Sequence, residues 1–394
     1  MRVPDSSFLS TILSATETPC VSIYLPAHRA NGNAHGSLTD QENHGRFRNL
    51  ADRVEEVLTK THPGAVATNI AKQLHKFRDD EDFWGRVQDG VVVLASPERF
   101  DAFTLPRTVP EFVKVGESFY VKPLLRFVQS AEPFHVLGVS RERVALFRGN
   151  RYELQPLRVA SIPLTLTEAL GSETEPTTWR FHTAGQASAI HGGRGTHGAA
   201  ILSGQGGWSD EVQVDTRRFF QIVDRKVTDL VSEPSGLSLI PVGIEENLAM
   251  FRAVTKNRFV SADAVLGDWT NWSLHEIREK AWKVFEKHYL ARLAKIREDF
   301  GTAVAQGKGT SELVEAAKAA ATGRVGVLLI DADSTLPGTI DMATGALRPE
   351  IAGAATGDML DDLAEMGLRT KAQVIVTPSA QMPTKSGLAA IYRY

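Results

Sequence analysis

The sequence predicts a protein of several α/β domains, and three observations lead to this fold class. The chain of 394 residues is too long for one ordinary hydrophobic core. Short apolar runs bounded by glycine or proline, which are typical of buried strands, recur from one end of the chain to the other. Between them lie segments whose apolar residues repeat at three and four positions, which is typical of helices with one buried face.

The first predicted domain spans residues 1–130 and combines a sheet with helices. Its expected strands are residues 21–25, 90–94, 99–105 and 112–115, and its two helical stripes begin at Phe47 and Ile70. The run of residues 90–94 is the clearest strand, because a continuous apolar run of this length fits a strand buried on both faces. We expect the two strands that follow it to be its antiparallel neighbours.

The second predicted domain spans residues 131–257. Its expected elements are strands at residues 134–140, 143–148, 152–157 and 237–242, and helices at residues 210–231 and 244–253. Short turns join the first three strands, which predicts an antiparallel meander. The order of three antiparallel strands, helix, strand and helix fits an RNase H-like α/β domain.

The third predicted domain spans residues 258–394. Its expected elements are helices at residues 274–300, 311–321 and 359–366, and strands at residues 325–330, 373–377 and 388–394. Strands that alternate with helices predict a parallel sheet with right-handed crossovers.

The charge of the chain is small and evenly distributed. The formal net charge is −3, and no predicted domain is basic overall, which argues against a protein that coats nucleic acid through charge alone. Cys20 is the only cysteine, so disulfides within the chain and thiolate metal clusters are excluded, and a reducing cytoplasm is the expected location. We expect no membrane span and no cofactor, because the sequence has no long apolar stretch and no cofactor motif.

A glycine-rich segment at residues 182–209 precedes the first long helix of the second domain. Residues 176–209 contain no Asp or Glu but keep arginine and histidine, which suits a partner that carries phosphates. Two glutamines in this segment are flanked by small residues. Gln205 lies in Ser-Gly-Gln-Gly-Gly, and Gln186 lies in Ala-Gly-Gln-Ala-Ser.

The histidines of this segment do not predict a metal site. His182, His191 and His197 are nine and six residues apart, a spacing that fits no regular face of a helix or strand. Carboxylate ligands are missing nearby, so we expect no resident metal. Contact with phosphate or with solvent is the better interpretation for these side chains and for Arg194.

Three blocks of the sequence are similar to a known family. Residues 25–29 read Leu-Pro-Ala-His-Arg after the first strand, and the meander, glycine-rich segment and following helix form the second block. The third block is Val-Ile-Val-Thr-Pro at residues 374–378, Met382-Pro383, and Gly-Leu-Ala-Ala-Ile-Tyr-Arg-Tyr at residues 387–394. This last block is similar to the ending of archaeal and eukaryotic class-1 peptide-chain release factors and of Pelota. The whole chain resembles their bacterial relatives, the bacterial archaeo-eukaryotic release factor family.

The resemblance implies a fold and a place of action. The fold would comprise an N-terminal α/β domain, an RNase H-like middle domain that bears a catalytic loop, and a C-terminal α/β domain like the kink-turn-binding ribosomal proteins. A protein of this kind would bind the A site of the ribosome. Its implied partners are therefore the ribosome, with rRNA and peptidyl-tRNA, and a translational GTPase.

The resemblance also implies which residues act. In true release factors the middle loop carries Gly-Gly-Gln, which enters the peptidyl-transferase centre and helps water to attack the peptidyl-tRNA ester. This sequence has no Gly-Gly-Gln. Two functions therefore remain open. The protein either releases the peptide through Gln205, or less favourably Gln186, or acts in ribosome rescue or hibernation without hydrolysis. The residues expected to contact RNA are Gly204, Gly206, Gly207, Arg194, His191 and His197.

Residues 327–336 suggest a different function, a phosphatase of the haloacid-dehalogenase type. In such enzymes one Asp attacks phosphorus and a second acts as the acid beside a magnesium ion, and Asp331 and Asp333 have the matching spacing. Gly357-Asp358 with Asp361 and Asp362 imitates the metal-binding motif of these enzymes. Too few residues separate Asp333 from this motif for the βα units that lie between the two motifs in such an enzyme. We therefore expect Asp331 to cap a strand end and Asp358 to lie at a helix N-terminus. A non-catalytic binding or scaffold protein of the same fold is a third interpretation.

Overall fold

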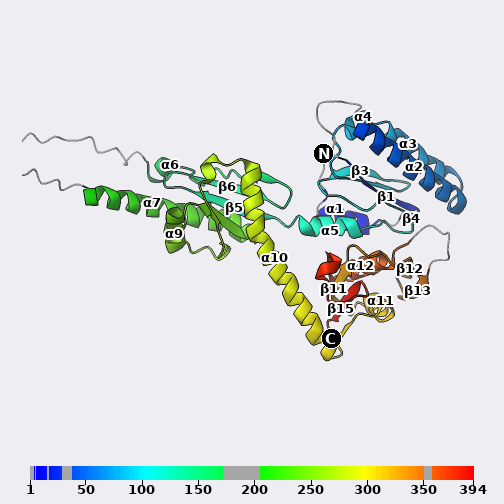
Figure 1. The fold of residues 1–394 in the computed structure, drawn as a ribbon. Coiled ribbons are helices and arrows are strands. Elements are labelled where there is room, and N and C mark those ends of the chain that lie inside the picture. The colour runs from blue at the N-terminus through cyan, green and yellow to red at the C-terminus, as the bar shows by residue number, and fades with distance from the viewer. Residues whose placement is uncertain (1–3, 5, 16, 29–37, 172–204, 350–356) are drawn as a thin grey trace, which may run out of the picture. The chain divides into compact units, whose positions relative to one another are not determined.

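The computed structural model describes residues 4, 6–15, 17–28, 38–171, 205–349 and 357–394 (Figure 1). The chain divides into two compact units: unit 1 comprises Met1–Ala131 together with Leu290–Tyr394, and unit 2 comprises Glu132–Tyr289. Both units combine sheets with helices, so the predicted mixed α/β architecture is confirmed. None of the helices in the described ranges has the length and hydropathy of a membrane span.

The N-terminal part of unit 1 contains an antiparallel sheet of four strands in the order β3-β2-β1-β4. The elements are α1 (Ser6–Leu13), β1 (Cys20–Pro26), α2 (Leu38–Thr61), α3 (Ala65–Arg78), α4 (Glu81–Trp84), β2 (Gly90–Ala95), β3 (Phe100–Leu105), β4 (Phe112–Gly116) and α5 (Lys122–Ser130). Every residue of β2 is buried, as its apolar run predicts. The prediction that β4 pairs with β2 is wrong. Because β1 and β3 occupy the two edges of β2, β4 pairs with the free edge of β1.

Helices cover both faces of this sheet. In Figure 1, α2 and α3 lie side by side on one face, and α1 and α5 lie on the opposite face. Phe47 of α2 and Ile70 of α3, where the predicted stripes begin, are completely buried in one core cluster with Ile23 of β1 and Trp84. The two helical stripes therefore pack on the sheet as their spacing predicts.

The C-terminal part of unit 1 contains a mixed sheet in the order β10-β15-β11-β14. The elements are α10 (Leu274–Ala305), β10 (Gly309–Thr310), α11 (Leu313–Ala321), β11 (Val325–Asp331), β12 (Gly338–Ile340), β13 (Leu347–Pro349), α12 (Met359–Arg369), β14 (Gln373–Thr377) and β15 (Leu388–Tyr392). β11 and β14 are parallel, but β15 runs antiparallel to β11, so the prediction of a fully parallel sheet is wrong. The reason is the connection from β14 to β15, which holds a short 3-10 turn at Ser379–Gln381 in place of the crossover helix that a further parallel strand needs.

A side chain of α5 covers the outer edge of β14. Gln129 Nε2 donates a hydrogen bond to the carbonyl oxygen of Val374 at 2.6 Å, and the backbone N–H of Val376 donates to Gln129 Oε1 at 2.8 Å. β14 is the last strand of its sheet, so the carboxamide takes the place of a neighbouring backbone there. The N-terminal and C-terminal parts of unit 1 are joined along this edge.

Unit 2 contains a five-stranded sheet in the order β7-β6-β5-β8-β9. The elements are β5 (Phe134–Val139), β6 (Val144–Gly149), β7 (Leu154–Pro156), α6 (Leu166–Leu170), α7 (Gln205–Val227), α8 (Glu233–Ser235), β8 (Leu239–Gly243), α9 (Glu245–Val254), β9 (Val265–Leu266) and the first part of α10. β5, β6 and β7 form the antiparallel meander that the short turns predict. β8 is parallel to β5, and β9 is parallel to β8.

Each face of the unit 2 sheet has its own core cluster. Leu137 and Val139 of β5 belong to one cluster with side chains of α7 and α9. Phe134 of β5 belongs to the other, with Trp269 and Phe285 of the segment that follows β9. The predicted boundary between residues 257 and 258 therefore falls inside unit 2, because β9 and the first part of α10 complete its sheet and its second core. A strand of two residues such as β9 leaves no periodic pattern in the sequence.

Candidate functional site

The glycine-rich segment belongs to unit 2, between α6 and α7. Residues 172–204 lie outside the described residues, and with them Gln186, His191, Arg194, His197 and Gly204. α7 begins at Gln205, five residues before the predicted start, so Gln205, Gly206 and Gly207 are the first residues of this helix. The roles assigned to these residues stay predictions.

Two side-chain hydrogen bonds cap the N-terminus of α6, the helix before the segment. Thr165 is the N-cap of α6, and its hydroxyl accepts a hydrogen bond from the backbone N–H of Glu168 at 3.2 Å. The Glu168 carboxylate in turn accepts a hydrogen bond from the N–H of Leu164 at 2.8 Å. These two hydrogen bonds resemble a capping box in which the Glu side chain reaches the residue before the N-cap, and they fix where α6 begins. α6 ends at Leu170, and its C-cap, Gly171, has a positive φ of 74°.

The helix after the segment is held by a buried stripe. The stripe consists of Phe219, Phe220, Val223 and Val227, none of which is exposed to solvent. α6 and α7 contact one another, so the two ends of the glycine-rich segment leave from helices that pack together. The segment is therefore anchored at both ends on the sheet of unit 2.

A buried carboxylate ties α7 to the end of α9. Asp224 of α7 is buried and accepts hydrogen bonds from the hydroxyl of Thr255 at 2.5 Å and from the N–H of Lys256 at 2.8 Å. One turn after α7 ends, Ser232 accepts a hydrogen bond from the Asn257 side chain at 2.8 Å. These contacts fix the C-terminal end of α7, and they follow from no short motif in the sequence.

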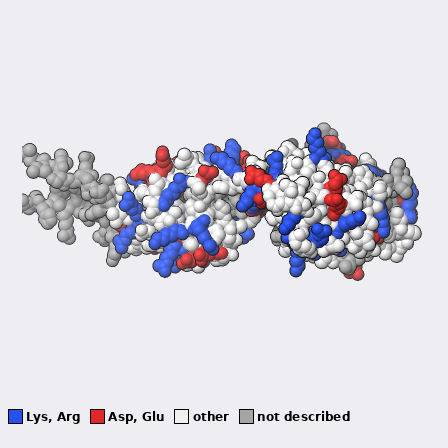
Figure 2. Space-filling model, turned by 90° about the horizontal axis from the view of Figure 1, so that it is seen from below, with Lys and Arg blue, Asp and Glu red and all other residues white. Residues whose placement is uncertain are grey.

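The exposed face of α7 carries positive charge that our sequence reading missed. Arg217, Arg218, Arg225 and Lys226 are exposed along this face. Arg225 lies 4.0 Å from Asp229, and the only other carboxylates in residues 213–227 are the half-buried Asp215 and the buried Asp224. The sequence contains a signal for this face, namely the two basic pairs Arg217-Arg218 and Arg225-Lys226, which lie at helix positions next to buried residues of the stripe. Elsewhere the face of the molecule in Figure 2 shows Lys and Arg interspersed with Asp and Glu.

The aspartates of the phosphatase-like run stabilise turns. Asp331 ends β11, and its carboxylate accepts hydrogen bonds from the N–H of Asp333 at 2.8 Å and from the hydroxyls of Ser334 at 2.6 Å and Ser379 at 2.7 Å. Burial opposes ionisation of Asp331, but these hydrogen bonds outweigh it and hold the pKa below its ordinary value. Asp333 forms an ion pair with Arg126 at 2.6 Å. The expectation that Asp331 caps a strand end is confirmed.

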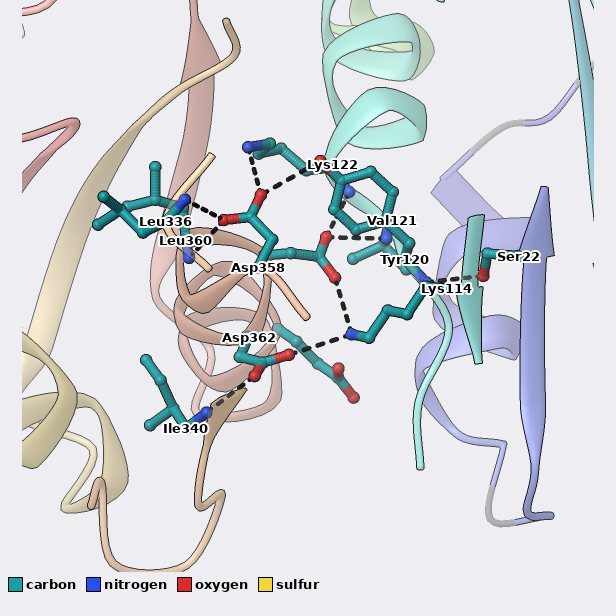
Figure 3. A network of polar contacts seen from close by, with 12 residues as sticks. Ser22, Lys114, Tyr120, Val121, Lys122, Leu336, Ile340, Asp358, Leu360 and Asp362 are labelled. Atoms are coloured by element: carbon teal, nitrogen blue, oxygen red, sulfur yellow. Dashed lines mark hydrogen bonds and ion pairs between the residues drawn. The ribbon is translucent and has the colours of Figure 1, made fainter. Parts of the chain in front are cut away.

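Two lysines of the N-terminal part meet the carboxylates at the start of α12 (Figure 3). Lys122 Nζ lies 2.5 Å from Asp358 Oδ2, and Lys114 Nζ lies 3.1 Å from Asp362 Oδ1 and 3.4 Å from Asp361 Oδ2. Within the described residues, no group of three or more His, Cys, Asp and Glu side chains is arranged to hold a metal ion. The carboxylates that imitate a metal-binding motif are thus neutralised by lysines of the same chain.

Backbone N–H groups donate further hydrogen bonds to these carboxylates. Asp358 is the N-cap of α12, as predicted, and accepts hydrogen bonds from the N–H of Leu360 at 3.1 Å and of Leu336 at 3.0 Å. Asp361 Oδ1 accepts from the N–H of Val121 at 2.9 Å and of Lys122 at 2.7 Å. The carboxylates of α12 therefore hold the start of α5 and the loop before β12 in place.

Burial shifts the pKa values in this network. The pKa of Asp361 is raised to about 7, chiefly because the carboxyl is completely buried. The attraction of Lys114 opposes this rise, and the charges of Asp362 and Asp358 contribute to it. Burial alone would lower the pKa of Lys114, but Asp361 and Asp362 outweigh that effect and raise it above its ordinary value. Burial also raises the pKa of Tyr120, whose hydroxyl donates to Asp358 at 3.2 Å. This is the chemistry of a buried structural contact between the two parts of unit 1.

A family model matches the central part of the chain. Residues 133–324 match the model of bacterial archaeo-eukaryotic release factor family 3, a range that includes the meander, the glycine-rich segment, α7, α10 and α11. The resemblance seen in the sequence is confirmed by this match. None of the curated proteins matches the chain.

Three solved structures are similar over most of the chain but superpose poorly. The archaeal translation termination factor aRF1 is 16% identical, with 99% of this chain and 97% of that chain covered, at a TM-score of 0.25. Archaeoglobus fulgidus Pelota is 15% identical, with coverage of 77% and 79%, at a TM-score of 0.31. Saccharomyces cerevisiae Dom34, a translation termination-like factor, is 9% identical, with coverage of 75% and 74%, at a TM-score of 0.35. The family resemblance therefore rests on residues 133–324.

Proposed function

We propose that this protein, whose residues 133–324 belong to bacterial archaeo-eukaryotic release factor family 3, is a release-factor-like translation factor that binds the A site of the ribosome. The observation that carries the proposal is the range of the family match. It spans the glycine-rich segment together with both helices that anchor it. We infer that residues 182–209 are directed at peptidyl-tRNA.

The composition of the segment supports this placement. Residues 176–209 contain no carboxylate side chain, so they can approach an RNA backbone without charge repulsion. Glycine lacks a Cβ, so Gly204, Gly206 and Gly207 allow close approach of the backbone to RNA. Arg194 and the histidines His191 and His197 supply hydrogen-bond donors for phosphate oxygens.

The chemistry assigned to the segment is positioning of water. In the catalytic version, Gln205 orients the water that attacks the peptidyl-tRNA ester, and backbone N–H groups stabilise the developing oxyanion. Gln186 is the less favoured candidate for the same role. In the alternative version the segment occupies the site during ribosome rescue or hibernation and no ester is hydrolysed.

The exposed basic face of α7 provides a second contact in this proposal. Arg217 and Arg218 lie on the helix that leads directly from the segment into the core of unit 2. A helix that carries positive charge on its solvent face binds phosphates through charge and not through base sequence. Delivery by a translational GTPase belongs to the same proposal, on the strength of the family resemblance.

Ribosome co-sedimentation tests binding. The full-length protein is mixed with empty, translating and stalled ribosomes, and the pelleted fraction is measured at several salt concentrations. We expect association with at least one of these particles, decreasing as salt rises. Absence of association with all three at low salt would rule out the proposal.

Peptide release separates the catalytic version from the alternative. Release is measured from ribosomes loaded with peptidyl-tRNA, for the native protein and for the Gln205→Ala and Gln186→Ala variants. The matched control is Gln221→Ala, an exposed glutamine further along α7. Release that is lost only in Gln205→Ala supports catalysis through this residue. Association without release in any variant supports the non-hydrolytic version.

A further inference from the structure

A solvent-open cavity of about 540 Å³ lies at the surface of the C-terminal part of unit 1, beside α11 and the end of β15. Its volume falls in the range of small-molecule sites in proteins. Ala319 of α11, with a small and buried side chain, lies at its wall, and Tyr392 and Tyr394 bring two aromatic rings to it. Neither the glycine-rich segment nor the carboxylate network of α12 contributes to this cavity.

The cavity offers flat surfaces for stacking. The Arg324 guanidinium lies 4.9 Å from the centre of the Tyr392 ring, and this stacked pair forms one side of the lining. Tyr394, which also lines the cavity, is 69% exposed to solvent. Aromatic rings and guanidinium planes are the groups on which proteins stack nucleobases.

Charges of both signs line the same cavity. Lys318 and Arg324 are exposed cations at its wall, and both are donors suited to phosphate oxygens. Glu315 lies one helical turn before Lys318 on α11, and its carboxylate is fixed by a hydrogen bond from the hydroxyl of Thr310 at 2.8 Å. Glu315 can only accept hydrogen bonds, so it favours a base edge that presents N–H groups.

We propose that this cavity binds a nucleotide, with the base stacked against the Tyr394 and Arg324 planes and the phosphate held by Lys318 and Arg324. Glu315 accepts hydrogen bonds from the base. Guanine is the preferred base, because its pairing edge presents two adjacent N–H donors. The nucleotide is either a free mononucleotide or an exposed guanosine of RNA, since both carry the same base and phosphate.

Calorimetric titration of the full-length protein tests the proposal. The probes are guanosine monophosphate, adenosine monophosphate, unphosphorylated guanosine and a single-stranded guanosine trinucleotide. We expect guanosine monophosphate to bind more tightly than adenosine monophosphate. Binding of the mononucleotide identifies a free nucleotide as the source, and binding of the trinucleotide alone identifies RNA. Both outcomes support nucleotide recognition at this cavity.

Three variants assign the contacts. Tyr394→Ala removes an exposed ring and is expected to weaken binding about tenfold. Lys318→Ala is expected to weaken the binding of guanosine monophosphate and to leave the binding of unphosphorylated guanosine unchanged. Glu315→Gln is expected to abolish the preference for guanine over adenine, because an amide both donates and accepts.

The controls are exposed residues that do not line the cavity. Val314→Ala changes α11, where 48% of Val314 is exposed, and Lys385→Ala removes an exposed positive charge. Both are expected to bind like the native protein. Absence of binding by every probe at millimolar concentration, or binding unchanged in both Tyr394→Ala and Lys318→Ala, would overturn the proposal. No ribosome enters this experiment, so its result is independent of the function proposed above.

Discussion

Lys122 of α5 and Asp358 at the N-cap of α12 form an ion pair of 2.5 Å in which the side chains are 2% and 0% exposed. The two residues are separated by 236 positions in the chain. They belong to the N-terminal and C-terminal parts of unit 1, so this pair is one of the contacts that hold the two parts together. Two charges buried in this way are costly to separate, because either one alone would remain desolvated and unpaired.

Removal of one partner should therefore destabilise unit 1. Lys122→Met keeps the length of the side chain but leaves the Asp358 carboxylate buried without its cation, and we expect a loss of about 3–5 kcal/mol. The measurement is urea-induced unfolding followed by circular dichroism. The double variant Lys122→Met with Asp358→Asn should recover part of the loss, because it removes the orphaned charge.

An exposed ion pair provides the control for this measurement. Arg126 and Asp333 lie 2.6 Å apart with side chains that are 24% and 48% exposed. Arg126→Ala should cost less than about 1 kcal/mol, because solvent screens a pair of this kind. Equal losses in Lys122→Met and Arg126→Ala would contradict the structural role of the buried pair.

Asp361 should make unit 1 less stable as the pH rises through neutrality. Burial raises its pKa in the folded protein from 3.8 to about 7, so between these values the folded state holds a proton that the unfolded chain has released. The stabilisation linked to this proton is complete below about pH 4 and is lost as pH rises through 7. Urea midpoints measured between pH 5 and pH 8 at constant ionic strength should fall for the native protein.

Asp361→Asn should flatten this dependence. The amide oxygen of asparagine can still accept the hydrogen bonds from Val121 and Lys122, but the variant has no proton to release. A slope equal to that of the native protein would show that other groups cause the dependence.

His135 should have the opposite effect in unit 2. Burial lowers its pKa to about 4, with a further contribution from the charge of Arg148 on the paired strand, so the folded state excludes a proton that the unfolded chain binds below pH 6.5. Stability linked to His135 is present above about 6.5 and is lost as the pH falls towards 4. We expect urea midpoints for unit 2 to drop on acidification through this range.

His135→Leu should remove this sensitivity to acid. The Nδ1 atom of His135 is buried without a hydrogen-bond partner, so an apolar side chain of similar size should preserve or increase stability at pH 7. The readout is the same urea titration at pH 5 and pH 7. A variant that loses as much stability between these two values as the native protein would refute the assignment to His135.

The basic face of α7 should set the salt dependence of ribosome binding. Replacement of Arg217 and Arg218 by alanine removes two exposed charges, and the slope of log affinity against log salt should decrease by about two. The control is the pair Arg48→Ala and Arg53→Ala, two exposed arginines on α2 of unit 1. Co-sedimentation over a series of salt concentrations measures both slopes. Equal slopes for the two double variants would remove α7 from the proposed interface.

Much of the fold could be predicted from local patterns. The apolar run at residues 90–94 marks a strand that is buried throughout, and the stripe from Phe219 to Val227 marks the packed face of α7. Such patterns indicate which side chains are buried, and they can be recognised from a few neighbouring residues. They do not indicate which strands pair with one another in a sheet. β4 and β15 take positions that depend on which strand edges are already occupied.

The carboxylates of α12 show the limit of motif reading. Asp358, Asp361 and Asp362 have a spacing that imitates a metal site, and the sequence predicted a structural role, at a helix N-terminus, for Asp358 alone. Their partners Lys114 and Lys122 lie more than 230 residues earlier. Only the folded arrangement shows that a cation from the same chain takes the place that a metal ion would have.

The Gln129 carboxamide at the rim of β14 has a consequence for the behaviour of the protein at high concentration. A bare terminal strand offers a row of backbone donors and acceptors to any passing chain and so invites assembly into fibres or mismatched dimers. Here a single amide group pairs with the backbone carbonyl of Val374 and the backbone N–H of Val376, in the middle of a five-residue strand. One uncharged side chain thus occupies this edge of the sheet, and we expect it to oppose self-association there, as proline or added charge does on the edge strands of other proteins.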